Sequence, residues 1–319
     1  MPYPRRMDTP SLSSAVIRKL ASIVGADNVL TSDEDRLCYA YDGQRVECVP
    51  DAVVRPVDAE QIARVLILAN EERFAVVPRG AGTGLSGGSI ASRGGIVLDL
   101  TRMRRIIEID AANQHMVVEP GVITAEIARE AEKIGLLYPP DPGSVKVSTI
   151  GGNVAENAGG LRAGKYGVTR NYLMRLSAVA PNGEAFKSGA PTRKCVAGYD
   201  LVSLMCGSEC TLGVITQITL RLIPLPKYRK SMTATFPNCA AAGRAVAAIV
   251  AAGLVPATLE IIDNFTLRVI EDYARLGLPT DVGALVLAEF DGLAECAVEE
   301  EWRLGTQALA DSGAIAIQQ

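Results

Sequence analysis

The spacing of hydrophobic positions changes along the chain between a helical period and a two-residue period, which predicts mixed helices and strands. In the first part, helical spacing predicts helices over residues 11–24, 58–72 and 124–134, and Asp58 is the expected N-cap of the second. Short apolar or alternating runs predict the strands 52–54, 74–77, 95–100, 106–109, 116–119, 173–180, 184–187 and 214–223. The runs 106–109 and 116–119 flank a polar turn and predict a hairpin.

The pattern changes after a basic segment with two prolines, 224–230, which is typical of a linker. Beyond it, predicted strands alternate with predicted helices: strands 231–236, 257–262, 284–290 and 314–317, and helices 238–252, 264–276 and 294–311. This alternation predicts a second α+β unit with its own sheet. The whole chain is therefore assigned to the α+β class, and 319 residues agree with about two domains.

Composition and charge exclude several functional classes. With 32 basic and 36 acidic residues, the chain lacks the basic excess that nucleic-acid binding requires. His115 is its one histidine, which excludes a metal site that needs two imidazoles, and no metal is expected. Seven cysteines without a CxxC pair indicate a reduced, cytoplasmic protein. The apolar run near 245–255 is too short for a transmembrane segment, and no signal peptide follows the two arginines at the start.

The first of two glycine-rich loops is PRGAGTGLSGGS, residues 78–89. Clustered glycines let backbone N–H groups approach a phosphate, because no Cβ intervenes. Gly82, Gly84 and Gly87 satisfy the pattern GxGxxG, but a dinucleotide-binding βαβ unit also needs a helix that starts inside the motif. Here the loop continues into a predicted strand, so the Rossmann interpretation fails. A surface loop without a ligand remains the alternative.

The second glycine-rich loop is STIGGNVAENAGG, residues 148–160, inside a stretch from 139 to 167 with little periodicity. Residues 159–165 also match the opening of a P-loop, G-x4-G-K. Tyr166 then stands where Ser or Thr would hold Mg²⁺, which argues against a P-loop. A buried, glycine-packed turn is the alternative to a ligand-binding loop. Two separate glycine loops without a Rossmann helix indicate a long diphosphate ligand that lies across both.

Four motifs in fixed order carry a resemblance to a known family. They are the loop 78–89, PPDPGS at 139–144, the loop 148–160, and GYDLVSLMCGSECTLGVIT at 198–216. Together the motifs closely resemble the FAD-linked oxidases with a PCMH-type (vanillyl-alcohol-oxidase) flavin domain. The branch most similar to this chain contains the glycolate oxidase FAD-binding subunit and D-lactate dehydrogenase. The resemblance covers roughly residues 30–319. It implies an N-terminal helical segment (1–45), a two-subdomain FAD-binding domain (46–226) and a partial cap domain (227–319).

The resemblance implies noncovalent FAD, because the first loop has no His or Cys where flavin-linking relatives carry one. Residues of the first loop would hold the pyrophosphate: Arg79, Gly80, Ala81, Gly82, Thr83 and Gly84. Pro142 and Gly143 would lie near the isoalloxazine and the ribityl chain. The second loop would wrap the rest of the diphosphate and the ribose: Ile150, Gly151, Gly152, Asn153, Asn157 and Gly160. The dinucleotide would also be lined by Glu209, Gly213, Val214 and Ile215.

The implied activity is the oxidation of a small 2-hydroxy acid to the 2-oxo acid, with the hydride passing to flavin N5. The family's HxGDGNxH-type metal-binding motif and the end of its flavin domain are missing here, so the chain is expected to be C-terminally truncated. The alternative is an FAD-binding subunit or fragment that is inactive without a partner chain. The resemblance also implies partner subunits of a glycolate-oxidase-like complex, through which a cytoplasmic chain would lie at the inner membrane.

The catalytic residues stay unassigned. Arg162, Lys165 and Tyr166 face the flavin or are solvated loop residues, and both interpretations are kept. Glu260 or Asp263 is a candidate acid or base, but structural polar residues at strand ends are the favoured interpretation. One residue departs from a motif: the family reads GSEGTLG, and this chain has Cys210 at the second glycine. If that position requires a positive φ, the cysteine costs about 1 kcal/mol or more.

Overall fold

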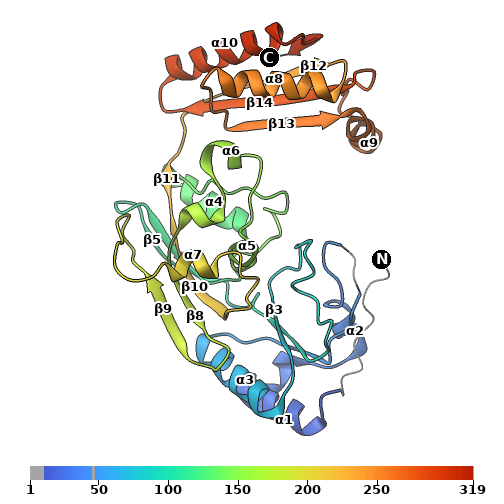
Figure 1. The fold of residues 1–319 in the computed structure, drawn as a ribbon. Helices are drawn as coiled ribbons and strands as arrows, with labels where there is room; N and C mark the ends of the chain where they lie inside the picture. The colour runs from blue at the N-terminus through green and yellow to red at the C-terminus, as the bar shows by residue number, and fades with distance from the viewer. Residues whose placement is uncertain (1–10, 45–46, 319) are drawn as a thin grey trace. The chain divides into compact units, whose positions relative to one another are not determined.

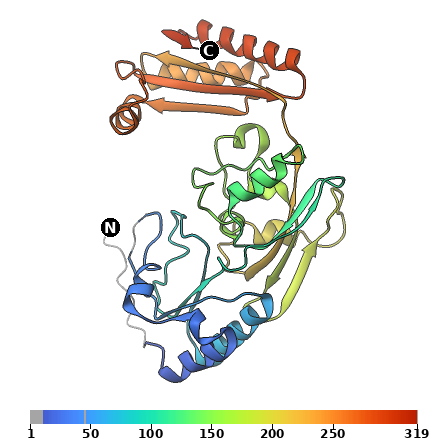
Figure 2. The ribbon, with the colours of Figure 1, turned by 180° about the vertical axis from the view of Figure 1, so that it is seen from behind.

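The computed structural model describes residues 11–44 and 47–318 and divides into two compact units, which Figures 1 and 2 show from opposite sides. Unit 1 comprises Met1–Tyr138, Ser144–Ala158 and Thr169–Ile223. Unit 2 comprises Pro139–Gly143, Gly159–Val168 and Pro224–Gln319. The mixed α+β class predicted from the sequence is confirmed. The expectation about a signal peptide concerns residues outside the described part.

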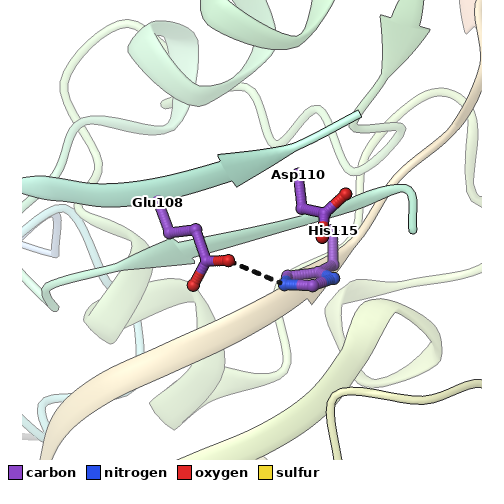
Figure 3. Close-up of side chains that lie close together, drawn as sticks. All are labelled: Glu108, Asp110 and His115. Atoms are coloured by element: carbon purple, nitrogen blue, oxygen red, sulfur yellow. Dashed lines mark ion pairs between the residues drawn. The ribbon is translucent and has the colours of Figure 1, made fainter. Parts of the chain in front are cut away.

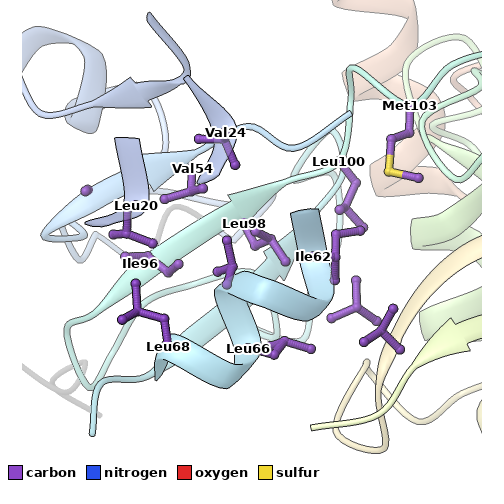
Figure 4. Packing of buried hydrophobic residues seen from close by; sticks show 14 of the residues in the cluster. Leu20, Val24, Val54, Ile62, Leu66, Leu68, Ile96, Leu98, Leu100 and Met103 are labelled. Atoms are coloured by element: carbon purple, nitrogen blue, oxygen red, sulfur yellow. The ribbon is translucent and has the colours of Figure 1, made fainter. Parts of the chain in front are cut away.

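The first sheet of unit 1 has four strands in the order β1-β2-β4-β3. They are β1 (Val29–Leu30), β2 (Ala52–Val54), β4 (Ile96–Asp99) and β3 (Val76–Arg79). Strands β2, β4 and β3 are parallel to one another, whereas β1 is antiparallel to β2. Helices α1 (Ser14–Val24) and α3 (Ala59–Glu72) pack on this sheet, and Leu20, Ile62 and Leu98 are fully buried between them (Figure 4). A short helix, α2 (Asp33–Leu37), follows β1.

The second sheet of unit 1 has five strands in the order β5-β6-β10-β8-β9, all antiparallel. They are β5 (Ile106–Asp110), β6 (His115–Val118), β10 (Val214–Arg221), β8 (Leu173–Val179) and β9 (Ala185–Gly189). The predicted hairpin is confirmed, because β5 and β6 are adjacent and antiparallel. Helices α4 (Thr124–Glu132), α5 (Ile150–Glu156) and α7 (Leu201–Met205) belong to the same unit. Short strands β7 (Leu136–Leu137) and β11 (Ile223–Pro224) pair separately.

The second glycine-rich segment is the main correction to the sequence-based elements. Residues 139–167 were expected to be irregular, yet they contain α5 and the short helix α6 (Ala163–Tyr166). Glycine has a low helix propensity, and α5 contains two glycines, so the sequence pattern does not predict a helix there. The prediction for the first loop is confirmed: all of residues 80–95 are described, and none is helical between β3 and β4. A Rossmann-type helix is therefore absent from this part of the chain.

Unit 2 contains a four-stranded antiparallel sheet in the order β13-β14-β12-β15. Its strands are β12 (Tyr228–Phe236), β13 (Thr258–Asp263), β14 (Ala284–Gly292) and β15 (Ala316–Gln318). Helices α8 (Cys239–Ala251) and α10 (Glu295–Asp311) cover one face, where Phe236, Ala245 and Phe290 are fully buried. A further helix, α9 (Asn264–Ala274), follows β13. In the described part of the chain, every helix is too short or too polar to cross a membrane.

Two N-caps provide a matched test of both units: Asp58, expected from the sequence, and Asn238, with which the predicted helix 238–252 begins. Asp58 Oδ1 accepts a hydrogen bond from Gln61 N at 2.8 Å at the start of α3, and Asn238 Oδ1 accepts one from Ala241 N at 2.9 Å at the start of α8. We expect Asp58→Ala and Asn238→Ala each to lower the free energy of unfolding by about 1 kcal/mol, because a terminal N–H loses its acceptor. Urea unfolding measures the change. Asp58→Asn keeps the acceptor and is the control, so an equal loss in this variant would contradict the capping role.

Candidate functional site

A cavity of about 270 Å³ lies within unit 1, between the loop that follows β3 and the segment that contains α5. Its walls are mostly small residues and exposed backbone from these two segments. One further part of the wall comes from the turn before β10, which contributes Glu209 and Cys210. Two glycine-rich segments that are about 70 residues apart in the sequence are thus brought to the same cavity.

The first loop is organised by the side chain of Arg79, the last residue of β3. This side chain is buried, and its guanidinium donates to the backbone oxygens of Tyr41 at 2.8 Å and Ser89 at 3.3 Å. Gly82 has a φ of +70°, and a Cβ at this position would lie 2.1 Å from the Arg79 guanidinium. The loop therefore curls around Arg79, and glycine is required at the closest approach. Burial lowers the pKa of Arg79, and the nearby Asp99 carboxylate opposes this effect.

A buried polar network continues from Arg79 to the next strand. Asp99 lies opposite Arg79 in the β3–β4 register and is almost fully buried. Its carboxylate accepts hydrogen bonds from the Tyr39 hydroxyl and from Thr101 N, each at 2.9 Å, and forms an ion pair with Arg55. Burial, together with the Asp99 charge, raises the pKa of Tyr39 to about 12. The tyrosine therefore stays a neutral donor to Asp99 at physiological pH.

In the second wall segment, Thr149 caps α5 through its side chain. A Cβ on Gly80 would lie 2.1 Å from Thr149 Oγ1, so the absence of a side chain lets the first loop approach this cap. A Cβ on Gly151 would lie 2.6 Å from Pro120 Cβ, which makes this glycine a packing requirement. At Gly152, by contrast, a Cβ would meet no atom closer than 3.4 Å. Internal packing therefore does not require a glycine at position 152, which presents backbone without a side chain in the cavity lining.

The turn before β10 contributes two consecutive left-handed residues that are not glycine. Glu209 has a φ of +51° and Cys210 a φ of +57°. The sequence-based condition for strain at Cys210, a positive φ, is therefore met. The turn also satisfies carbonyl groups at the end of α5: Gly207 N donates to Val154 O and Glu209 N to Ala155 O, both at 2.9 Å. Burial raises the pKa of the Cys210 thiol to about 11, so this cysteine is neutral at physiological pH.

The sequence-based candidates divide into those that line the cavity and those that do not. The candidates that line it are Arg79, Gly80, Ala81, Gly82, Thr83, Gly84, Gly151, Gly152, Asn153, Glu209 and Ile215. Ile150, Gly213 and Val214 of unit 1 lie outside the lining, and Asn157 ends α5 in a left-handed conformation. Pro142, Gly143 and Gly160 belong to unit 2. Further lining residues, which the motifs do not mark as ligand contacts, include Ser144, Ser148, Thr149, Glu156 and Cys210.

Polar residues that were left open as catalytic candidates have structural partners. In unit 2, Lys165 and Tyr166 both contact the carboxylate of Asp291, and Arg162 Nε lies 3.4 Å from Asp141 Oδ2. Asp263 caps α9 by accepting a hydrogen bond from Thr266 N at 2.8 Å. Glu260 is half-buried on β13. These contacts support the structural interpretation for Asp263 and show that Lys165 is not a freely solvated loop residue.

Among the described residues, one group of side chains has the spacing of a metal site: Glu108, Asp110 and His115 (Figure 3). His115 begins β6, and its Nε2 lies 3.8 Å from Glu108 Oε1. The Asp110 carboxylate already accepts hydrogen bonds from Asn113 N and Nδ2. On the other side of His115, the neighbour in register on β10 is Arg221, whose positive charge would repel a metal cation. This donor set is therefore a poor match for a metal ion.

Two protein-family models match the chain, one in each part. Residues 50–189 match the model described as "FAD binding domain". Residues 225–318 match the model described as "FAD linked oxidases, C-terminal domain". The second match begins at residue 225, within the proline-containing segment 224–230.

Curated relatives resemble the chain over most of its length. The glycolate oxidase subunit GlcD of Bacillus subtilis (strain 168) is 46% identical over 282 residues, which cover 88% of this chain and 60% of the relative. The D-lactate dehydrogenase of Anaerostipes hadrus is 38% identical, over 92% of this chain and 63% of the relative. The chain thus spans somewhat less than two thirds of the length of these relatives.

Solved structures show the same fold at low sequence identity. An alkyldihydroxyacetonephosphate synthase superposes with a TM-score of 0.80 at 20% identity. The superposition covers 98% of this chain and 63% of the synthase chain. A p-cresol methylhydroxylase with substrate bound superposes with a TM-score of 0.79 at 19% identity. Here the superposition covers 95% of this chain and 65% of the hydroxylase chain. The architecture is therefore the PCMH-type fold that was expected.

The left-handed conformation of Cys210 predicts that glycine is more favourable there. We expect Cys210→Gly to raise the free energy of unfolding by about 1 kcal/mol, because glycine adopts this φ without a Cβ clash. Cys210→Ala keeps the Cβ and should give no such gain. Thermal and urea unfolding of both variants test the expectation, and equal stabilities for the two would show that the backbone at this position is not strained.

Proposed function

The chain belongs to the FAD-linked oxidases, and from this premise we propose that unit 1 binds FAD in the glycine-lined cavity and that the loaded protein oxidises a small 2-hydroxy acid. The substrate is of the glycolate or D-lactate type, and the product is the 2-oxo acid. The observation that carries the proposal is the bare backbone wall at Gly84 and Gly152, two glycines from segments that are far apart in the sequence. Such a wall is what a diphosphate requires.

The residues of the cavity fit this cofactor. At both Gly84 and Gly152, an added Cβ would meet no protein atom closer than 3.4 Å, which is ordinary van der Waals contact, so internal packing does not require a glycine at either position. Arg79 is the one Lys or Arg side chain in the lining, and its guanidinium points to Tyr41 and Ser89. Backbone N–H groups rather than cationic side chains would therefore hold the diphosphate. The carboxylates of Glu156 and Glu209 are acceptors suited to ribose hydroxyls.

We assign the binding roles as the family resemblance implies. The first loop would hold the pyrophosphate, and the second segment, with Glu209 and Ile215, would line the remainder of the dinucleotide. Pro142 and Gly143 would lie near the isoalloxazine and the ribityl chain, and Asn157, Gly160, Gly213 and Val214 would complete the site. FAD is proposed to be noncovalent, because residues 78–89 contain neither His nor Cys.

The proposed domains are an N-terminal helical segment (1–45), the FAD-binding domain (46–226) and a partial cap domain (227–319).

When bound, FAD supplies the hydride acceptor. The protein has to bind the substrate carboxylate, orient the hydroxyl-bearing carbon and accept the hydroxyl proton. No residue is assigned to the proton transfer. His115, the one histidine, is buried in the five-stranded sheet beside Glu108. This placement favours a second candidate function, in which the 319 residues bind FAD but oxidise no substrate without another polypeptide.

Partner subunits are part of the proposal. One similar protein is named a glycolate oxidase subunit, which for that protein implies an assembly. By analogy we propose that this chain works in the cytoplasm with partner subunits that accept its electrons and place it at the inner membrane.

A visible spectrum under anaerobic titration tests the proposed function directly. We expect the purified chain to carry an oxidised flavin band that bleaches on addition of glycolate or D-lactate, because the hydride reduces the flavin. A chain that binds no flavin would overturn the proposal. A flavin band that dithionite bleaches but neither substrate does would instead support the second candidate function.

Gly152 permits a test in which stability and cofactor affinity change in opposite directions. We expect Gly152→Ala to stabilise the fold by up to about 1 kcal/mol, because alanine favours helix α5. The same methyl group should raise the dissociation constant of FAD at least about tenfold, because it narrows the cavity. Equilibrium titration with FAD measures the affinity. Gly243→Ala in α8 is the control, because this glycine lies in a helix outside the cavity lining and a Cβ there meets no atom within 4 Å. This variant should leave the FAD affinity unchanged. Unchanged affinity in both variants would argue against FAD at this wall.

A further inference from the structure

A buried carboxylate in unit 2 gathers two side chains from a distant segment. Asp291, near the end of β14, is 3% exposed. Its Oδ1 lies 2.6 Å from Lys165 Nζ, and the Tyr166 hydroxyl lies 2.7 Å and 2.8 Å from its two carboxylate oxygens. Lys165 Nζ also donates to the Asp291 backbone oxygen at 2.5 Å. We call these three residues the Asp291 cluster.

The charge on Asp291 is balanced within this cluster. Arg229 is its neighbour in register on β12, but the Arg229 guanidinium forms an ion pair with Glu289, at 3.2 Å from Nε to Oε1. The ion pair of Asp291 is with Lys165, whose side chain is itself largely buried. Burial of a carboxylate is unfavourable unless its partners are well placed, so loss of either partner should disturb this cluster strongly.

The segment that supplies Lys165 and Tyr166 is joined to a second one. Arg162 N donates to Asp141 Oδ1 at 3.2 Å, and the Arg162 guanidinium forms an ion pair with the same carboxylate. A Cβ on Gly160 would lie 2.1 Å from the backbone oxygen of Asp141, so the two segments of the chain are in close contact there. Residues 139–143 and 159–168 therefore form one body within unit 2, and the Asp291 cluster fixes this body to the sheet.

The chain between these two segments is the cavity wall. Residues 144–158 run from one to the other and contribute Ser144, Thr149, Gly152 and Glu156 to the cavity lining of unit 1. Both ends of the wall segment are thus covalently continuous with parts of unit 2. Within unit 1 the segment is also held by backbone hydrogen bonds, in which Thr124 N donates to Ser148 O and Thr169 N donates to Ala158 O, both at 3.0 Å. The Asp291 cluster is a second restraint, which acts on the chain just beyond the two ends of the segment that carries Gly152.

We propose that Asp291 is a positioning residue for the cofactor: through Lys165 and Tyr166 it fixes the ends of the wall segment 144–158, so that unit 2 contributes to FAD affinity. The proposal rests on the proposed function, because it takes FAD as the ligand of the cavity. It also assigns a role to Lys165 that differs from phosphate binding, although residues 159–165 resemble the start of a P-loop. The ammonium group is committed to Asp291 and is not free to neutralise a phosphate.

The test compares FAD affinities of variants in the complete chain. We expect Asp291→Ala and Lys165→Met each to raise the dissociation constant of FAD about tenfold, a usual size for coupling between two sites. Tyr166→Phe, which removes one neutral donor, should have a smaller effect in the same direction. Lys165→Arg keeps the cation and should restore most of the affinity. Glu289→Gln is the matched control on the same strand and should bind FAD like the wild type.

Two further readouts separate positioning from a purely structural role. Circular dichroism verifies that each variant is folded, and if Asp291→Ala does not fold, Lys165→Met and Tyr166→Phe carry the test. Hydrogen exchange of residues 159–168 should slow when FAD binds to the wild type and should not slow in Lys165→Met, because coupling between two sites is reciprocal. Variants that unfold at lower temperature but bind FAD like the wild type would overturn the inference. A wild-type chain that binds no FAD would overturn the proposed function instead.

Discussion

The cavity of unit 1 depends on one buried guanidinium. Arg79 ends β3, and its side chain turns back to bind the backbone at Tyr41 and Ser89, which lie before and after the strand. The loop that follows can therefore present its own backbone to a ligand, because its shape is set from within. Gly82 is the consequence of this constraint, since any side chain there would collide with the guanidinium. The arginine thus shapes the glycine-rich loop of the cavity wall through contacts within the protein.

The same constraint explains why glycines recur in the second wall segment. Gly80 lets the Arg79-centred loop approach Thr149, and Thr149 caps the helix that carries Gly151 and Gly152. Gly151 is required by the packing against Pro120, whereas no protein atom crowds the space beside Gly152. Adjacent glycines in one helix thus have different causes, one internal to the fold and one at the cavity. A substitution at the first should disturb the fold, whereas a substitution at the second should disturb only what the cavity holds.

Much of the fold could be predicted from local pattern, because its determinants are local. The caps at Asp58 and Asn238 are short-range hydrogen bonds, and the hairpin of β5 and β6 follows from alternation across a polar turn. Helix α5 was not predicted, because its two glycines are explained by features outside the local sequence. Gly151 packs against Pro120, and Gly152 lines the cavity. The Asp291 cluster could not be predicted for the same reason, since 126 residues separate Lys165 from Asp291. In the candidate site, the family motifs identified the two glycine-rich walls, but the structural role of the Arg79 side chain required the fold.

Cys210 shows how the site tolerates strain. It follows Glu209 in the left-handed region, and two such residues in succession are unfavourable for side chains with a Cβ. The turn is nevertheless fixed, because Gly207 N and Glu209 N donate to the carbonyl oxygens of Val154 and Ala155 at the end of α5. Straightening the turn would break both of these hydrogen bonds, a loss that opposes relief of the strain at Cys210. The conformation of Cys210 is thus imposed by the helix that forms the cavity wall, and the strain there is a consequence of building that wall from a short, glycine-containing helix.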